Sequence, residues 1–194
     1  MALGDRTRIA ILASGSGTNA QRLIEHFKGS TLAEVVLVGC DQPRAGVLDR
    51  AWKLGVPSLL FTAKELREGV VEKELGALRI DVVVLAGFLR LIPIGMVRAF
   101  EGRIVNIHPA LLPKYGGKGM YGANVHRAVI EAGDARSGIT IHLVNERYDE
   151  GEHLLQIECE VKRDDTPEVL ADRIHALEHE HFPRAVEKLI ERLR

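Results

Sequence analysis

The sequence predicts an α/β protein: an open, mostly parallel, twisted sheet with helices on both faces and an antiparallel hairpin in its C-terminal half. In the first half, short apolar runs alternate with segments whose apolar residues recur at helical spacing. The run 81–86 lacks polar alternation, which is typical of a parallel strand buried on both faces. In the second half, 138–144 and 154–161 alternate in polarity across a short turn, as the strands of a hairpin do.

The elements of the first half follow one another as strand and helix. Strands are expected over 8–13, 34–39, 57–61 and 81–86. The first helix follows the glycine-containing segment 15–19 and carries Leu23, Ile24 and Phe27 on one face. Further helices are expected over 45–54, where Gly55 ends the pattern, and over 63–78. This order is typical of a Rossmann-like half, in which helices connect parallel strands.

The second half begins with a short strand that contains Ile104 and Val105. It must end near Pro109, because proline cannot continue a central strand. A glycine-rich loop over 115–122, a helix over 124–132 and the hairpin follow. Thr166 is suited to cap a last helix and Pro167 to open it, and this helix extends to Leu193.

Composition and charge favour a single domain that acts on a small molecule. We expect one domain over 1–194, with a phosphate-binding half over 1–100 and a catalytic half over 101–194. The 26 basic and 27 acidic side chains leave a net charge of -1, so bulk charge indicates neither a nucleic-acid nor a membrane partner. Residues 1–8 lack the apolar core of a signal peptide and no apolar run spans a bilayer, so we expect a cytoplasmic protein. Cys40 and Cys159 lie in apolar runs without metal-ligand spacing and are expected to be buried.

The segment that contains Gly17, Thr18 and Asn19 lies between a strand and a helix. Backbone amides at such a helix start can bind a phosphate, and glycine lets the anion approach the backbone closely. The same letters fit the dinucleotide pattern G-x-G-x-x-A, with Asp41 placed where a ribose-binding acid would be. A nicotinamide-dependent dehydrogenase or redox sensor is therefore an alternative. A third possibility is a tight turn with Thr18 as the helix cap.

Asn106 and His108 are the strongest catalytic candidates. Two positions apart on an extended strand, they point to the same side, and the chain leaves the sheet directly after them. Such a pair can stabilise the negative charge that builds on oxygen in an acyl-type transfer. If the later hairpin folds back over this strand, Asp149 can pair with His108 and raise its pKa. The alternative for Asp149 is a solvated turn, and His142 either orients the site or packs.

Two histidines near the C-terminus raise the question of a metal site. His175 and His179 are one helical turn apart, a spacing that suits zinc. The H-E-x-x-H order is absent and no third ligand is evident, so a solvated helix face is expected instead, with no metal. No serine or cysteine nucleophile motif is present, which agrees with direct attack by a substrate amine.

The chain resembles the phosphoribosylglycinamide formyltransferase family (glycinamide ribonucleotide transformylases) over nearly all of its length. The resemblance rests on segments 15–19, 84–90, 106–114, 142 with 149–151, and 178–179 with 183, in this order. It implies transfer of a formyl group from 10-formyltetrahydrofolate, the cosubstrate, to the amine of glycinamide ribonucleotide in purine biosynthesis. It also implies a monomer or a weak homodimer, with no metal.

The resemblance also implies roles for individual residues. Gly17, Thr18 and Asn19 match the loop for the ribonucleotide phosphate, and Glu178 matches an acid that contacts the ribonucleotide. The pair Asn106 and His108 matches the groups that stabilise the tetrahedral intermediate, with His108 as proton donor and Asp149 as the aspartate beside it. The folate cosubstrate is matched by Asn106 and by Lys64, Leu89, Arg90, Leu91 and Ile92.

Three positions depart from the family pattern. Lys64 stands where relatives carry an arginine, so that folate contact is expected to be weaker. The segment 117–122 is longer than the common spacing and is expected to form a flap in which a lysine steers an anionic substrate. Ala110 replaces a frequent serine.

Further alternatives are other members of the same fold and a non-catalytic nucleotide-binding module. A methionyl-tRNA formyltransferase needs an additional RNA-binding domain, and a formyl-folate hydrolase normally carries an extra N-terminal module. The phosphate loop favours a small phosphorylated acceptor over both.

Overall fold

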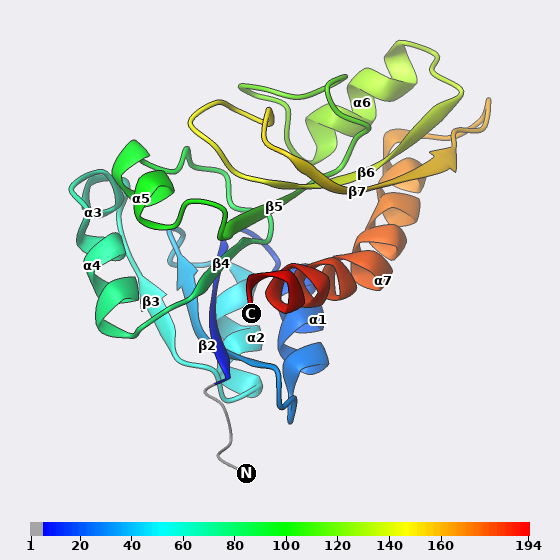
Figure 1. The fold of residues 1–194 in the computed structure, drawn as a ribbon. Helices are drawn as coiled ribbons and strands as arrows, with labels where there is room; N and C mark the ends of the chain where they lie inside the picture. Colours follow the sequence, from blue (N-terminus) through cyan, green and yellow to red (C-terminus); the bar gives the residue numbers. More distant parts are fainter. Residues whose placement is uncertain (1–5) are drawn as a thin grey trace.

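The computed structural model describes residues 6–194 and contains one seven-stranded sheet (Figure 1). The part of the signal-peptide expectation that concerns residues 1–5 lies outside this range. The strands, in chain order, are β1 (Thr7–Ala13), β2 (Ala33–Cys40), β3 (Ser58–Leu60), β4 (Val82–Leu85), β5 (Ile104–His108), β6 (Arg136–Leu143) and β7 (His153–Glu160). Their order across the sheet is β3-β2-β1-β4-β5-β6-β7. The first five are parallel, and β6 and β7 pair antiparallel at one edge, so the predicted fold class is confirmed.

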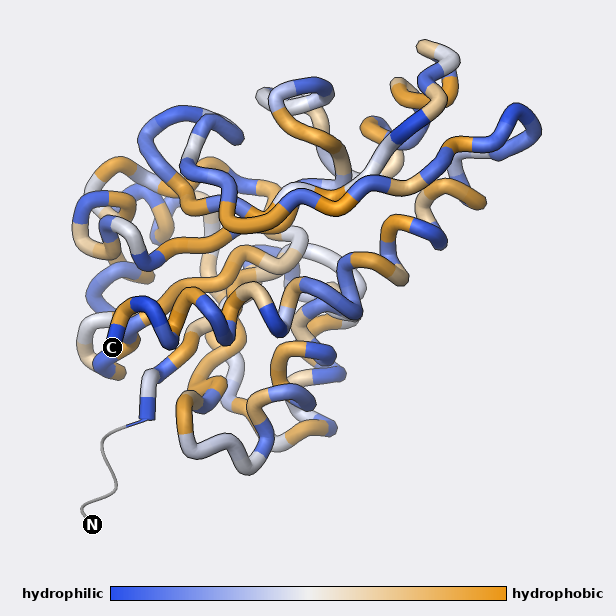
Figure 2. The backbone as a smooth tube through the Cα atoms, turned by 45° about the vertical axis from the view of Figure 1, so that its right-hand side comes forward, coloured by the Kyte–Doolittle hydropathy of each residue, from blue (hydrophilic) through white to orange (hydrophobic). Residues whose placement is uncertain are grey.

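Seven helices are found in the described part of the chain. They are α1 (Thr18–Phe27), α2 (Gly46–Lys53), α3 (Ala63–Arg67), α4 (Val70–Ala77), α5 (Ile94–Ala99), α6 (Ala123–Glu131) and α7 (Pro167–Leu193). Helices α1, α2, α6 and α7 contribute to the hydrophobic core on one side of the sheet, and α3, α4 and α5 to the core on the other. Figure 2 shows hydrophobic segments along the strands and hydrophilic segments in the outer loops.

The central strands supply side chains to both cores. In β1, Ile9 and Ile11 belong to one core, whereas Ala10 and Leu12 belong to the other. Successive side chains of a strand point to opposite faces, so a run without polar residues is what two covered faces require. This accounts for the absence of polar alternation in both β1 and β4.

Two helical details differ from the sequence prediction. The segment 63–78 is not one helix, because Gly69 adopts φ +77° and separates α3 from α4. Thr62 caps α3 in a capping box with Glu65. Helix α5 was not expected, since its six residues are too few to show a helical period. The cap of α7 is as predicted: the Thr166 side chain accepts from the Val169 amide, and Pro167 is the first helical residue.

The topology places the ends of β1, β4 and β5 at one edge of the sheet. The chain order reverses between β1 and β4, and in open α/β sheets ligands bind at such a switch point, beyond the carboxyl ends of the strands. No helix within residues 6–194 is both long and apolar enough to cross a membrane. Both cysteines are free; Cys40 is buried and Cys159 half-buried.

Candidate active site

A cavity of about 630 Å³ lies at this edge of the sheet, within the size range of small-molecule sites. It brings together most of the residues selected from the sequence. Its lining includes Gly17, Thr18, Asn19, Leu89, Arg90, Leu91, Ile92, Asn106, His108, Asp149 and Glu178. The loops that follow β1, β4 and β5 supply most of this lining, and β5, β6, the β6–β7 turn, α6 and α7 contribute further residues.

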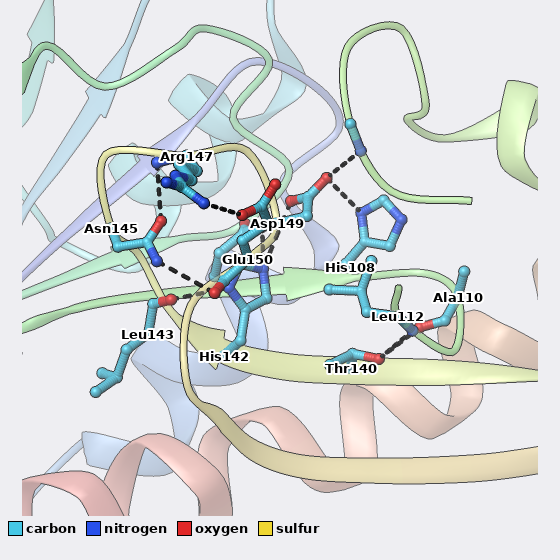
Figure 3. A network of polar contacts seen from close by, with 12 residues as sticks. His108, Ala110, Leu112, Thr140, His142, Leu143, Asn145, Arg147, Asp149 and Glu150 are labelled. Atoms are coloured by element: carbon cyan, nitrogen blue, oxygen red, sulfur yellow. Dashed lines mark hydrogen bonds and ion pairs between the residues drawn. The ribbon is translucent and has the colours of Figure 1, made fainter. Parts of the chain in front are cut away.

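The antiparallel register of β5 and β6 sets two pairs of polar side chains opposite each other. Asn106 faces His142, and His108 faces Thr140. The Thr140 hydroxyl donates to the Ala110 carbonyl (2.7 Å) and accepts from the Leu112 amide (3.0 Å) (Figure 3). Thr140 thereby fixes the chain where it leaves β5. Ala110 is fully buried and takes part through its backbone.

His142 orients the Asn106 carboxamide. The Nδ1 atom of His142 lies 2.9 Å from the Leu143 carbonyl, which can only accept, so in the neutral ring Nδ1 carries the proton. The Nε2 atom is then an acceptor, and it lies 3.2 Å from Asn106 Nδ2. One Asn106 N–H bond is used in this way, and the second remains available to a ligand in the cavity. Of the two roles considered for His142, the structure shows the orienting one.

His108 is held by a backbone carbonyl. Its side chain is 5% exposed, and Nε2 lies 2.8 Å from the Tyr115 carbonyl oxygen. Because that oxygen can only accept, Nε2 carries a proton. The other nitrogen, Nδ1, lies 3.8 Å from Asp149 Oδ2. Tyr115 is itself fixed, since its hydroxyl donates to Asp134 Oδ2 (2.8 Å), which also accepts from Lys114 (2.6 Å).

The β6–β7 turn returns Asp149 to the catalytic strand. The turn passes so close to β6 that a Cβ atom at Gly151 would lie 1.6 Å from the Leu143 carbonyl oxygen, so only glycine fits there. Asp149 Oδ1 lies 3.6 Å from His142 Nε2, and Oδ2 accepts from the Gly117 amide (2.8 Å) (Figure 3). Burial would raise the pKa of Asp149, but the adjacent His142, the hydrogen bond from the Gly117 amide and the nearby His108 hold it below its usual value. Asp149 is therefore a carboxylate at neutral pH.

The pKa of His108 differs from the sequence expectation. Burial lowers it, and this effect exceeds the opposing effects of Asp149 and of the hydrogen bond to Tyr115, so the net pKa lies below the usual value. Asp149 acts in the predicted direction, but the predicted net rise is wrong. The imidazole is therefore mainly neutral at pH 7, with Nδ1 free to accept a proton.

The loop before α1 presents backbone amides to the cavity. Gly17 is the N-cap and has φ +78°, and no side chain caps the helix, so Thr18 belongs to the first helical turn and is not the cap. The first amides of a helix lack internal acceptors, and the helix dipole adds positive potential there. The loop can therefore bind an anion, as expected.

Glu178 projects from α7 toward this loop. It is 6% exposed, and its Oε2 accepts from Asn19 Nδ2 (2.8 Å). Burial raises its pKa, although Asn19 and His175 act in the opposite direction. The Oδ1 atom of Asn19 and the Nδ1 atom of the neighbouring buried residue His126 have no partner within residues 6–194. Glu178, Asn19 and His126 all line the cavity, so this part of it is polar.

The segment after β4 forms a more apolar wall. Leu89 and Leu91 are exposed, whereas Ile92 is buried. Arg90 also lines the cavity and pairs with Asp41, its Nε lying 2.7 Å from Asp41 Oδ2. Asp41 also accepts from the Ser14 hydroxyl (2.6 Å). Asp41 is thus buried and already paired with protein groups, which argues against its use as a ribose-binding acid in a nicotinamide site.

Lys64 is the one predicted site residue outside this cavity lining. It lies on α3, is exposed, and its Nζ lies 3.9 Å from Glu68 Oε1. The predicted flap over 117–122 lines the cavity and includes Lys118. No cluster of three potential metal ligands is found among residues 6–194. His175 and His179 stack with ring centroids 6.4 Å apart.

Several site residues were missed by the sequence analysis. They are Tyr115, which acts through its carbonyl, Asp134, Arg50 and His126. Backbone contacts leave no signal in a single sequence. Asp134 and Arg50 lie outside the cavity lining and act on Tyr115 and on the loop at Ser16. His126 lies one turn into α6 and gave no spacing signal.

The fold and the site together define a class of protein, the formyl transferases. The features that define it are an α/β sheet with an anion-binding loop, an Asn–His–Asp cluster and an adjacent apolar wall. A formyl transferase family model matches residues 7–186, so the chain belongs to the formyl transferase family, and the family resemblance seen in the sequence is confirmed.

Particular relatives can also be named. The chain is 43% identical to the chloroplastic phosphoribosylglycinamide formyltransferase of Arabidopsis thaliana, over 96% of this chain and 66% of the relative. It is 40% identical to the trifunctional purine biosynthetic protein adenosine-3 of Drosophila melanogaster, over 95% of this chain and 14% of the relative. The phosphoribosylglycinamide formyltransferase structure from Bacillus halodurans superposes with a TM-score of 0.87 at 38% identity, covering 97% of each chain. The chain thus spans less than two thirds of the two curated relatives and nearly all of the bacterial structure.

Proposed function

We propose that this protein transfers the formyl group of 10-formyltetrahydrofolate to the amine of glycinamide ribonucleotide. The observation that carries the proposal is one cavity whose lining combines an anion-binding loop, an apolar wall and the cluster of Asn106, His108 and Asp149. The printed names of the relatives agree with this assignment. The cytoplasmic location, the monomer or weak homodimer, and the division into halves at residue 100 stay predictions.

The acceptor's phosphate is assigned to the amides of Gly17, Thr18 and Asn19. Its ribose hydroxyls are assigned to the polar part of the cavity lined by Glu178 and Asn19. The folate ring is assigned to the wall of Leu89, Leu91 and Ile92. Lys64 is left out of this set because it lies outside the lining.

The chemistry follows from the hydrogen-bond directions. The amine nitrogen attacks the formyl carbon, and the oxyanion that forms accepts a hydrogen bond from the free N–H of Asn106. Since Nδ1 of neutral His108 is unprotonated, it takes the proton released by the amine, and Asp149 stabilises the resulting imidazolium. The same proton then passes to the folate nitrogen as the carbon–nitrogen bond breaks. His108 remains the proton donor predicted from the sequence, but it first acts as a base.

A formyl-transfer assay tests the proposal directly. It follows release of 5,8-dideazafolate from its 10-formyl derivative, with glycinamide ribonucleotide as the acceptor. We expect release that depends on the acceptor and is lost in His108→Ala. Release without the acceptor would favour a hydrolase, and no release by folded protein would overturn the proposal.

The dehydrogenase alternative is tested by calorimetric titration with NAD. Trp52 is 78% exposed and lies outside the cavity lining, so its fluorescence is a poor reporter of binding. Micromolar binding of NAD without a response to a folate analogue would favour the alternative.

A further inference from the structure

Hydrogen bonds from α2 and α1 hold the outer side of the anion-binding loop, residues 15–17. The Val47 amide donates to the Gly15 carbonyl (3.1 Å), and Arg50 Nε donates to the Ser16 carbonyl (2.8 Å). The Gln21 amide donates to the Gly17 carbonyl (2.9 Å). Three consecutive carbonyl groups are therefore held on the side of the loop that faces the protein.

These contacts determine where the amides of the loop point. In a planar trans peptide, the N–H bond is directed opposite to the C=O bond. Fixing the carbonyls of residues 15, 16 and 17 therefore directs the amides of Ser16, Gly17 and Thr18 the other way. These three residues line the cavity, and no backbone acceptor for the Ser16 and Gly17 amides is found within residues 6–194. Successive amides arranged in this way form an anion-binding concavity.

Of the peptide groups in this loop, the one between Ser16 and Gly17 could most easily rotate so that its C=O and N–H groups exchange directions. Rotation of this peptide changes φ of residue 17, and glycine accepts both positive and negative φ. A reversed peptide would direct the Ser16 carbonyl oxygen, instead of the Gly17 amide, at a bound anion. Packing alone does not fix this group, since Ser16 is exposed.

Arg50 is the side chain that holds this peptide. Besides its bond to the Ser16 carbonyl, its guanidinium donates to Gln21 Oε1 on α1. Arg50 thus connects α2, the loop and α1. The fork geometry of the guanidinium lets one side chain make both bonds with fixed directions, which an ammonium group cannot reproduce.

We propose that Arg50 is a positioning residue for the anion site, which acts by holding the Ser16 carbonyl so that the Gly17 amide faces the ligand. The inference rests on the proposed function only in taking the ligand's anionic group to be the acceptor's phosphate. Arg50 does not itself line the cavity.

The test compares Arg50→Met and Arg50→Lys with the control Lys53→Met. Lys53 lies on the same helix, and its ammonium pairs with Asp49 (2.7 Å), so the control removes a nearby positive charge without touching the loop. We expect both Arg50 variants to raise KM for glycinamide ribonucleotide at least tenfold, with KM for the formyl-folate within twofold of the wild type. The control should change neither constant by more than twofold.

A second measurement does not depend on turnover. Inorganic phosphate is titrated into labelled protein, and the amide resonances of Ser16 and Gly17 are followed by NMR. We expect saturable shifts in the wild type and in Lys53→Met, and their loss in Arg50→Lys. Unchanged shifts and KM in Arg50→Lys would overturn the inference, as would an equal loss in Lys53→Met, which would indicate charge alone. Phosphate shifts without any formyl transfer would instead overturn the proposed function and leave the role of Arg50 supported.

Discussion

Replacing Gly17 by alanine should destabilise the protein and weaken the anion site, whereas the same change at Gly15 should not. Gly17 has φ +78°, and a Cβ atom there would lie 2.5 Å from Val47 Cβ and 2.6 Å from Val47 Cα. Val47 is fully buried and part of α2, so it cannot move aside without shifting that helix. A Cβ atom at Gly15 would meet no atom within 4 Å, and its φ is not in the left-handed region.

The expected loss at position 17 has two sources. The left-handed conformation costs a residue with a Cβ atom about 1–2 kcal/mol. Overpacking against a buried neighbour typically costs about 1–3 kcal/mol. Together they lower the free energy of unfolding by about 2–5 kcal/mol, which corresponds to a fall in Tm of roughly 4–20 °C for a chain of this size. Alanine at position 15 should leave stability unchanged or raise it by up to about 1 kcal/mol.

Urea denaturation and thermal unfolding, followed by circular dichroism, measure both variants. Calorimetric titration with glycinamide ribonucleotide then measures binding at a temperature where Gly17→Ala is folded. Weaker binding in Gly17→Ala is expected because relief of the clash must displace the loop. If Gly17→Ala and Gly15→Ala unfold at the same temperature, the packing argument is refuted.

Three further predictions concern the cavity. Asn106→Ala should lower kcat by about a hundredfold to a thousandfold, the typical effect of losing one donor to an oxyanion, and His108→Ala by about a hundredfold to ten-thousandfold, the typical contribution of a general acid–base group; steady-state kinetics on folded variants check this, and near-normal turnover would contradict it. Asp149→Asn removes the group that raises the pKa of His108, so the histidine should titrate at a lower pH in an NMR titration of its ring protons; an unchanged midpoint would exclude this role. Glu178 has a pKa raised by burial from 4.5, so the folded state binds its proton more tightly than the unfolded state, and the wild type should lose stability relative to Glu178→Gln as pH rises above 4.5; parallel stability curves for the two proteins would contradict this.

Most of the fold could be predicted from the sequence, because the local pattern of apolar residues agrees with their burial in the structure. The apolar runs that became β1 and β4 lie between two cores, and the capping residues of α7 satisfy the first turn of that helix. The break at Gly69 and the short helix α5 were missed, because a single glycine interrupts a continuous pattern and six residues show no clear period.

The chemistry of the site was predictable to the extent that it depends on residue type and spacing. Asn106 and His108 share a side of β5 because strand side chains alternate, and Gly17 adopts the left-handed conformation that glycine tolerates. The matching segments of the sequence also indicated a family resemblance, which the comparisons confirm.

The tertiary structure alone decided which hydrogen bonds and ion pairs connect these groups. The register of β5 against β6 places His142 beside Asn106, and the return of the turn at Gly151 brings in Asp149. The Tyr115 carbonyl determines which nitrogen of His108 is protonated, and burial determines that its pKa falls instead of rising. Hydrogen-bond direction and desolvation depend on which groups lie close together in space. When such residues are far apart along the chain, a single sequence gives no signal of their contact.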